Sequence, residues 1–302
     1  MRRNFIMKFT TSINCKDFFW RLVERAFEAD IVDRSAQVAF YFTFAIFPLI
    51  YFLISLFGLI LESSDGIKSE LFAYLHRLMP IAVFELVRKT IDEIVVNSTS
   101  GKATLGLIIT LWSASAGVDA IRNALNAAYS LKETRSWWRV KLQSLVLTFV
   151  VTTLAMFVLV IVFYGWELVQ YTLATFGFEV SSPLLLVGVQ WIATLLVTLL
   201  VCEIIYNLLP NFRRFEWKWI MPGSVVAILL WIIFTGGFRL YLGYFNSYNR
   251  AYGSLGAVII MMLWLYLTAL ALMIGGAINA VLSEMQTANN LTKPPPPEEP
   301  AT

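Results

Sequence analysis

Four ionisable side chains lie inside long apolar stretches of the sequence: Asp119, Arg122, Glu203 and Arg239. A charge near the centre of a bilayer costs about 2.5–3.5 kcal/mol on insertion scales, so such side chains usually face the protein interior. Their positions along the apolar stretches place Asp119, Arg122 and Glu203 toward one membrane face and Arg239 toward the other. The sequence therefore predicts two separate polar sites.

The first predicted site is an intramembrane polar cluster of Asp119, Arg122 and Glu203. Asp119 and Arg122 are three residues apart and are neighbours on one face of a helix. Arg122 is therefore expected to bridge Asp119 and Glu203 across two helices. The cluster could fix helix packing as a buried ion pair, or it could line a path for a solute or for protons. The sequence leaves both interpretations open.

The second predicted site is an outer-mouth ligand site around Arg239. This side chain and Arg250 would present two cations among Tyr248, Asn249 and Tyr252. A guanidinium group binds phosphate or carboxylate through two hydrogen bonds, so the expected ligand is anionic or rich in hydroxyl groups. The alternative is an aromatic belt in which arginine side chains reach lipid headgroups.

Other residue types that support catalysis are sparse in this sequence. The chain has one histidine, His76, and two distant cysteines, Cys15 and Cys202. It contains no glycine-rich loop followed by Lys and Ser or Thr, which would bind nucleotide phosphates. The sequence therefore predicts no metal, no cofactor and no enzymatic activity.

The composition indicates whether the segments that carry these sites lie in water or in lipid. The chain has 302 residues, of which 58% are hydrophobic and 14% charged, and its mean hydropathy is +0.70. So little polar surface cannot coat so much apolar material in water, so a lipid bilayer is the expected partner. The net charge of +3 is too small to predict a nucleic-acid partner. A soluble enzyme, a disordered regulator and a secreted disulfide scaffold are excluded.

The expected fold is an all-α polytopic membrane helix bundle. Spanning the bilayer takes about 20 apolar residues in a helix, and six stretches meet this length, at about 37–61, 103–128, 142–166, 183–209, 220–242 and 253–282. Most Lys and Arg residues of the connections fall on the side shared by both termini, which predicts cytoplasmic ends. The expected location is the inner membrane of a bacterium.

The segments outside the spans also have predicted roles. Residues 1–36 form a cytoplasmic arm whose stretch 16–31 is amphipathic and is expected to lie on the inner leaflet. Residues 62–102 carry two helical apolar stripes separated at Pro80, which predicts a helical cap over the outer mouth or two helices resting on headgroups. The transmembrane domain covers 37–283, and the proline-rich tail 284–302 is expected to be extended and disordered. Glycine pairs at 236–237 and 275–276 predict kinks or close helix contacts.

Several of these stretches, taken in order, resemble the YihY/BrkB family of bacterial inner-membrane proteins. The matching segments are Ala39-Phe40-Tyr41-Phe42, Phe47-Pro48-Leu49, Leu111-Trp112-Ser113-Ala114-Ser115, Ala124-Leu125-Asn126-Ala127-Ala128-Tyr129, Lys132-Glu133-Thr134-Arg135, Tyr206-Asn207-Leu208-Leu209-Pro210-Asn211, Pro222-Gly223, Ser247-Tyr248-Asn249-Arg250-Ala251-Tyr252-Gly253-Ser254-Leu255-Gly256, Leu263-Trp264-Leu265-Tyr266 and Asn279-Ala280. The resemblance implies six membrane helices with both ends cytoplasmic. It brings no agreed catalytic residues. Members are described as transporters or exporters, as serum-resistance factors and, under an old label, as a ribonuclease.

The sequence therefore predicts a transporter or exporter of a small polar or amphipathic solute. The alternative is a membrane scaffold, assembly factor or virulence-associated protein without turnover, and self-association into a homo-oligomer is compatible with either. Ribonuclease activity is not expected, because RNA hydrolysis needs acid–base groups or a metal cluster and His76 stands alone.

Overall fold

The computed structural model describes residues 15–62, 65–97, 103–175, 183–212, 217, 220–244 and 255–291. In these ranges all regular structure is helical, which confirms the all-α prediction. The helices are α1 (Cys15–Glu28), α2 (Ile31–Glu62), α3 (Asp65–Leu78), α4 (Ile81–Asn97), α5 (Ala103–Ala128), α6 (Trp137–Thr175), α7 (Pro183–Leu208), α8 (Pro222–Tyr244) and α10 (Leu255–Leu291). The extended tail is predicted to begin at residue 284, but α10 continues to Leu291, so residues 284–291 are helical. The tail beyond residue 291 lies outside the described residues.

Four of these helices contain segments long and apolar enough to cross a membrane. The segments are Trp137–Val158, Val187–Leu208, Pro222–Tyr244 and Leu255–Ala288. The other two predicted spans, 37–61 and 103–128, are also helical, as α2 and α5. The six membrane crossings therefore remain a prediction. Within the described residues, four of the six helices have the required length and composition.

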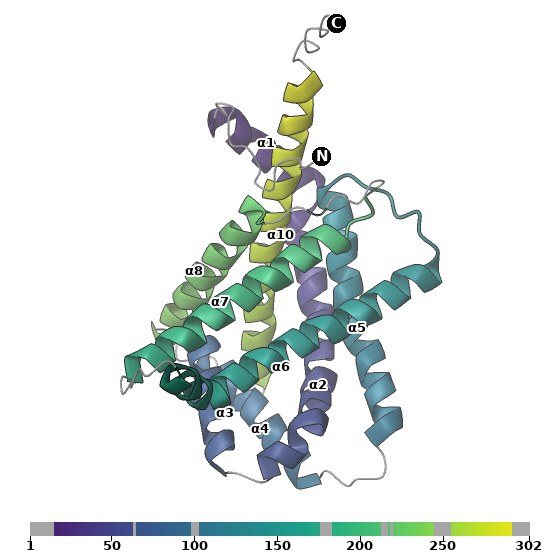
Figure 1. Ribbon diagram of the computed structural model, residues 1–302. Coiled ribbons are helices and arrows are strands. Elements are labelled where there is room, and N and C mark those ends of the chain that lie inside the picture. Colours follow the sequence, from purple (N-terminus) through teal and green to yellow (C-terminus); the bar gives the residue numbers. More distant parts are fainter. Residues whose placement is uncertain are drawn as a thin grey trace, which may run out of the picture.

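Helix bounds match the predicted spans closely where the chain turns sharply and poorly where a helix runs past its apolar segment. The α5 helix ends at Ala128 as predicted. Beyond it Ser130 has a φ of 52°, and the backbone N–H of Leu131 donates to Asn126 O at 2.7 Å, a Schellman-type stop. The α6 helix instead has 39 residues and a length of about 58 Å. That exceeds the bilayer core, and Figure 1 shows α6 and α7 crossing the upright α2 and α5 obliquely.

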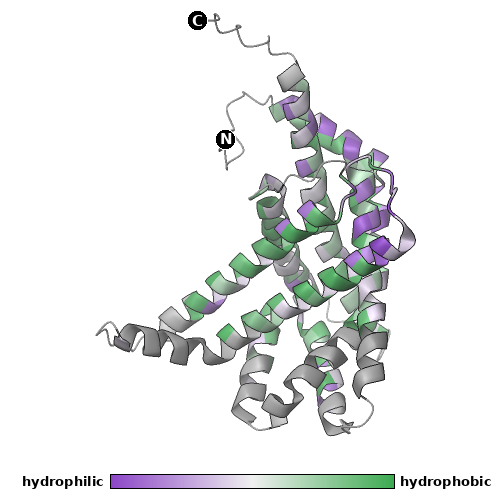
Figure 2. Cartoon of the chain, turned by 45° about the vertical axis from the view of Figure 1, so that its right-hand side comes forward, coloured by the Kyte–Doolittle hydropathy of each residue, from purple (hydrophilic) through white to green (hydrophobic). Residues whose placement is uncertain are grey.

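One end of the bundle gathers polar side chains, and we name it the polar end. It carries α1, the α5–α6 connection 129–136, residues 209–212 and 220–221, and the last turns of α10. The Arg25 guanidinium of α1 contacts Glu284 Oε1 of α10 at 2.6 Å, so the first and last described helices meet there. Figure 2 shows hydrophilic residues concentrated at this end and apolar residues along α6 and α7.

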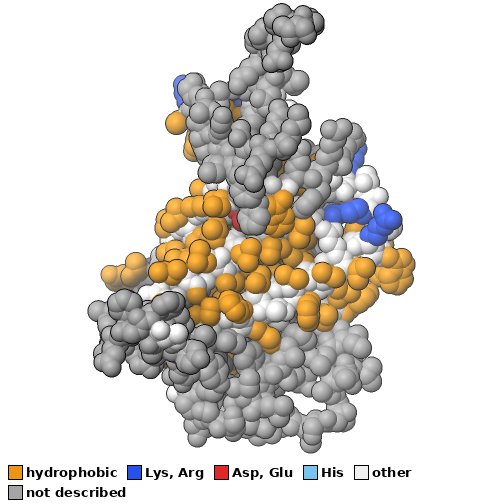
Figure 3. Space-filling view, viewed as in Figure 1, with side chains coloured by type: hydrophobic (Ala, Val, Ile, Leu, Met, Phe, Trp, Pro, Cys, Tyr) orange, Lys and Arg blue, Asp and Glu red, His pale blue; other side chains and the backbone are white. Residues whose placement is uncertain are grey.

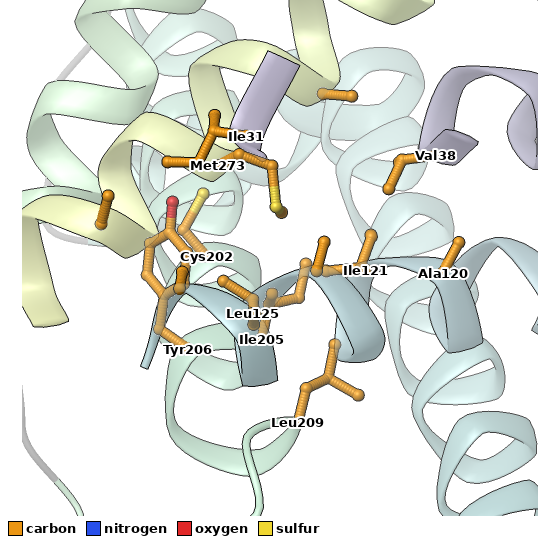
Figure 4. Close-up of a cluster of buried hydrophobic side chains, with 14 of the residues drawn as sticks. Ile31, Val38, Ala120, Ile121, Leu125, Cys202, Ile205, Tyr206, Leu209 and Met273 are labelled. Atoms are coloured by element: carbon orange, nitrogen blue, oxygen red, sulfur yellow. The ribbon is translucent and has the colours of Figure 1, made fainter. Parts of the chain in front are cut away.

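A first hydrophobic core is formed by the buried side chains that Figure 4 shows. It joins α5, α7 and α10 around Leu125, Tyr206 and Met273. The Tyr206 side chain is fully buried, and its hydroxyl donates to Leu272 O at 2.6 Å. This hydrogen bond satisfies the one polar atom that the tyrosine brings into the core.

A second core lies toward the opposite end and includes α4. Pro80 separates α3 from α4, as predicted, and Val83, Val87 and Ile91 of α4 are buried. They pack with residues of α8 and α10 such as Phe238 and Met261. The α4 helix is therefore part of the packed bundle. That this end faces the outside of the cell stays a prediction.

The described face of α6 and α7 is apolar. Figure 3 shows hydrophobic side chains spread across the face of α6 and α7, with Lys and Arg gathered at the edge where α6 begins. Exposed residues there include Leu142, Phe149, Ile192 and Leu196. Such a surface fits contact with lipid tails.

The α1 helix is also amphipathic, but its apolar residues divide between two sides. Leu22 and Ala26 pack against the first core, whereas Phe19, Trp20 and Phe27 are exposed. Because exposed aromatic residues combine here with basic ones such as Arg21, α1 has the composition of a helix at a membrane interface.

Candidate functional site

The predicted pair Asp119–Arg122 is the centre of a charge network at the polar end. Arg122 Nη1 lies 2.7 Å from Asp119 Oδ1, as their spacing on α5 predicts. Lys141 of α6 contributes a second cation, with its Nζ 3.1 Å from Asp119 Oδ2. The side chains of Arg122 and Lys141 are only 7% and 10% exposed, so one carboxylate neutralises two largely buried cations.

Hydroxyl groups complete this network. The Ser144 hydroxyl donates to Asp119 Oδ1 and accepts a hydrogen bond from Arg122 Nη1 at 3.1 Å. Lys141 Nζ donates to Ser115 Oγ at 2.6 Å and lies 4.5 Å from the centre of the Trp112 ring, in cation–π geometry. Each ionised group has an opposite charge, so this network fastens α5 to α6.

The α5–α6 connection extends the charge network. Glu133 Oε2 lies 3.5 Å from Arg122 Nε and 2.7 Å from Arg135 Nη2. Hydrogen bonding from Arg135 is the largest influence on Glu133 and lowers the pKa of its carboxyl to about 2. Arg135 also donates to Leu209 O at 3.0 Å and so caps the carboxyl end of α7.

Glu203 lies apart from the charge network. The backbone N–H of Met221 donates to Glu203 Oε1 at 2.7 Å. The expected bridge from Arg122 to Glu203 is not present, because Arg122 is committed to Asp119 and Glu133. Since α8 begins at Pro222, the Glu203 carboxyl sits at the amino terminus of that helix, where the helix dipole favours negative charge.

Two further polar side chains meet Glu203 around the first turn of α8. Ser224 belongs to that turn, and Asn279 of α10 accepts a hydrogen bond from Gly223 N at 2.8 Å through its Oδ1. Glu203 Oε2, Ser224 Oγ and Asn279 Nδ2 are all buried and have no hydrogen-bond partner in the described part of the chain. We name Glu203, Ser224 and Asn279 the α8 polar set.

Opposing contributions act on the free energy of the ionised Glu203 carboxylate. Moving an ionised carboxylate out of water costs several kcal/mol. The amino terminus of a helix stabilises a negative charge by about 0.3–2 kcal/mol, and a hydrogen bond to a charged group contributes about 1.5–3 kcal/mol. Burial thus disfavours the ionised carboxylate, whereas the helix terminus and the hydrogen bond from Met221 N favour it.

The α8 polar set is held by a close crossing of α8 and α10. A Cβ atom added to Gly223 would lie 2.0 Å from Gly275 O, and one added to Gly275 would lie 2.4 Å from the Tyr206 hydroxyl. The α10 helix runs unbroken through Gly275 and Gly276, so this predicted glycine pair allows close packing and not a break. Gly236 and Gly237 have open space around them.

Arg239 occupies a different environment at the opposite end. Its Nη2 donates to Met79 O at 2.8 Å, to His76 O at 3.2 Å and to Arg77 O. These carbonyls close the carboxyl end of α3, where a cation is favoured. The structure thus gives Arg239 a capping role. The other residues of the predicted outer-mouth site, Tyr248, Asn249, Arg250 and Tyr252, lie outside the described residues.

Comparisons with known proteins agree with the resemblance seen in the sequence. The family described as virulence factor BrkB matches residues 22–300. A ribonuclease-like protein of Bacillus subtilis (strain 168), named YfkH, is 32% identical over 253 residues, which cover 83% of this chain and 89% of that protein.

More distant relatives come from Xanthomonas species. A UPF0761 membrane protein of Xanthomonas campestris pv. campestris (strain 8004) is 24% identical over 92% of this chain, and the matched part is 63% of its own length. No solved structure matches the chain. The long family match and the identity to the Bacillus relative show that this chain is a membrane protein of the BrkB family.

Proposed function

We propose that this protein is a transporter of a small polar or amphipathic solute in the bacterial inner membrane. In this proposal α2 and α5 join the four apolar helices to make six spans, and the polar end faces the cytoplasm. The basic residues of α1 and of the α5–α6 connection support this orientation, because positive charge is retained on the cytoplasmic side.

The observation that carries the proposal is the α8 polar set. A structural polar group inside an apolar bundle normally has its hydrogen bonds filled, as most groups of the charge network do. The α8 polar set instead keeps three unpartnered polar atoms next to the contact between three helices. Polar groups of this kind inside a membrane bundle suit a path that a polar species enters and leaves.

We propose further that the protein is not an enzyme, and in particular not a nuclease. The name of the Bacillus relative refers to ribonuclease, but the chemistry of this chain argues otherwise. His76 packs edge-on against Phe84 at 5.2 Å between ring centres, and its carbonyl accepts from Arg239. The described part of the chain contains no group of three or more His, Cys, Asp or Glu side chains that could hold a metal ion.

A flux assay tests transport. The purified protein is reconstituted in liposomes loaded with a defined mixture of amino acids, organic acids and sugars, and the released solutes are identified by mass spectrometry. Wild-type protein is compared with Glu203→Gln, with protein-free liposomes and with Glu284→Gln, a change at an exposed carboxylate of α10. We expect one solute class to leave faster with wild type and Glu284→Gln than with Glu203→Gln. Release equal to that of protein-free liposomes would favour the scaffold alternative.

A further inference from the structure

Three helices bring the α8 polar set together. Glu203 comes from α7, Ser224 from α8 and Asn279 from α10, and their exposed fractions are 5%, 0% and 4%. Glu203 Oε1 is fixed by Met221 N, and Asn279 Oδ1 is fixed by Gly223 N. The remaining atoms of these side chains, Glu203 Oε2 and Asn279 Nδ2, are therefore the ones left for another interaction, together with Ser224 Oγ.

We propose that Glu203 is a proton-binding site, which gains and loses a proton on Oε2 while Ser224 and Asn279 serve as its hydrogen-bond partners. In the ionised state Oε2 accepts from the Ser224 hydroxyl or from the Asn279 amide. In the neutral state an O–H bond forms on Oε2, and this hydroxyl donates to Ser224 Oγ. The proton comes from water at the polar end and returns to it, and no electron is transferred.

The donor and acceptor types favour a proton over a metal ion. Gly223 N–H donates to Asn279 Oδ1, so the amide presents its N–H₂ group, a donor that repels a metal cation. The amino terminus of α8 contributes further positive potential. An anion would meet the Glu203 carboxylate itself. A proton is the one ligand that converts this carboxyl from an acceptor into a donor and suits the hydroxyl beside it.

None of the titratable groups described around Glu203 is a cation. Its titratable neighbours are Cys202 and Tyr206 on α7 and Tyr129 after α5, whereas α8 and α10 contribute Ser224 and Asn279. Burial, followed by the charge of Glu203, raises the pKa of Tyr129, so this phenol stays neutral. Among the described side chains no Lys, Arg or His forms an ion pair with Glu203. The charge of the carboxyl is thus balanced only by neutral donors and by the helix terminus.

The site differs from the charge network in a way that a measurement can resolve. Asp119 forms ion pairs with two cations, and Glu133 forms ion pairs with two arginines. Protonation of Glu203 leaves no cation without its partner. We therefore expect a change of pH to alter the protonation of Glu203, which has no cationic partner among the described side chains.

Infrared difference spectroscopy of the full chain in lipid vesicles tests the proposal. We expect a pH-dependent C=O band of a protonated, buried carboxyl group in wild type and in Glu284→Gln, and its loss in Glu203→Gln. Glu203→Asp should retain a titrating carboxyl band at an altered frequency. Ser224→Ala should raise the proton affinity about threefold, a shift of about half a pH unit, because the ionised carboxylate loses a donor.

Two results would overturn the proposal. One is a set of pH difference spectra that are identical in wild type and Glu203→Gln. The other is a Glu203 carboxyl that keeps one protonation state between about pH 4 and pH 10. The measurement uses no transported solute, so a protein that binds the proton yet moves nothing would disprove the transport proposal alone.

Discussion

Replacing Gly223 by alanine tests the helix crossing that holds the α8 polar set. The new Cβ would lie 2.0 Å from Gly275 O and 2.6 Å from the Asn279 side chain. Because Gly275 O is a backbone atom of α10, the two helices would have to move apart. Overpacking of this kind costs about 1–3 kcal/mol, and a weakened Gly223–Asn279 hydrogen bond would add about 1 kcal/mol. We expect Gly223→Ala to destabilise the protein by about 2–4 kcal/mol.

The matched control is Gly237→Ala in the same helix, because a Cβ there meets nothing within 4 Å. It should leave stability unchanged or raise it by up to about 1 kcal/mol through helix propensity. The assay is thermal unfolding in detergent followed by tryptophan fluorescence, in which about 2–4 °C corresponds to 1 kcal/mol in domains of 150–250 residues. Equal melting temperatures for the two variants would refute the close crossing of α8 and α10.

Three further predictions concern the other polar contacts. Arg239→Gln removes a cation from the carboxyl end of α3. Hydrogen exchange in that helix, measured by mass spectrometry, should become about 5–30-fold faster, which corresponds to about 1–2 kcal/mol. An unchanged rate would contradict the capping role. Asp119→Asn leaves the largely buried Lys141 without a carboxylate partner and Arg122 with Glu133 alone, and it should cost about 3–5 kcal/mol in thermal unfolding; Lys141→Met, which leaves Asp119 one cation, should cost less. The hydrogen bond from Arg135 lowers the pKa of Glu133 to about 2, so this carboxylate stabilises the fold above its unfolded-state pKa of about 4.3 and loses that effect as pH falls through about 2. The melting temperatures of wild type and Glu133→Gln should thus differ at neutral pH and converge near pH 2, and a constant difference would contradict the pairing.

Much of the architecture was accessible from hydrophobic length and helix stop signals. The apolar stretch 103–128 coincides with α5 (Ala103–Ala128), and Pro80 separates α3 from α4 as predicted. The beginning of α6 was not predictable in this way. The sequence places Lys141 in the connection before the membrane span. In the structure it belongs to α6, and its buried ammonium group donates hydrogen bonds to Ser115 and Asp119.

The candidate sites were predictable only in part, for a related reason. The three-residue spacing of Asp119 and Arg122 fixes their pairing on one helix. The partner of Glu203 depends on how α7, α8 and α10 cross, and no local spacing encodes that crossing. Ser224 and Asn279 are polar residues within apolar stretches, which is the one sequence signal that could have pointed to them. Likewise, the partners of Arg239 are backbone carbonyls, which every residue has, so the sequence could not identify them.

The orientation of the bundle can be measured with the two native cysteines. Cys15 of α1 is exposed, whereas Cys202 is buried, so a membrane-impermeant maleimide should report on Cys15 alone. We predict labelling in inverted membrane vesicles and none in intact bacterial cells. A Ser69→Cys change on α3 in a Cys15→Ser background should give the opposite pattern, because Ser69 is an exposed residue of the helix at the other end. Labelling of Cys15 from the outside of intact cells would contradict a cytoplasmic polar end and the membrane arrangement built on it.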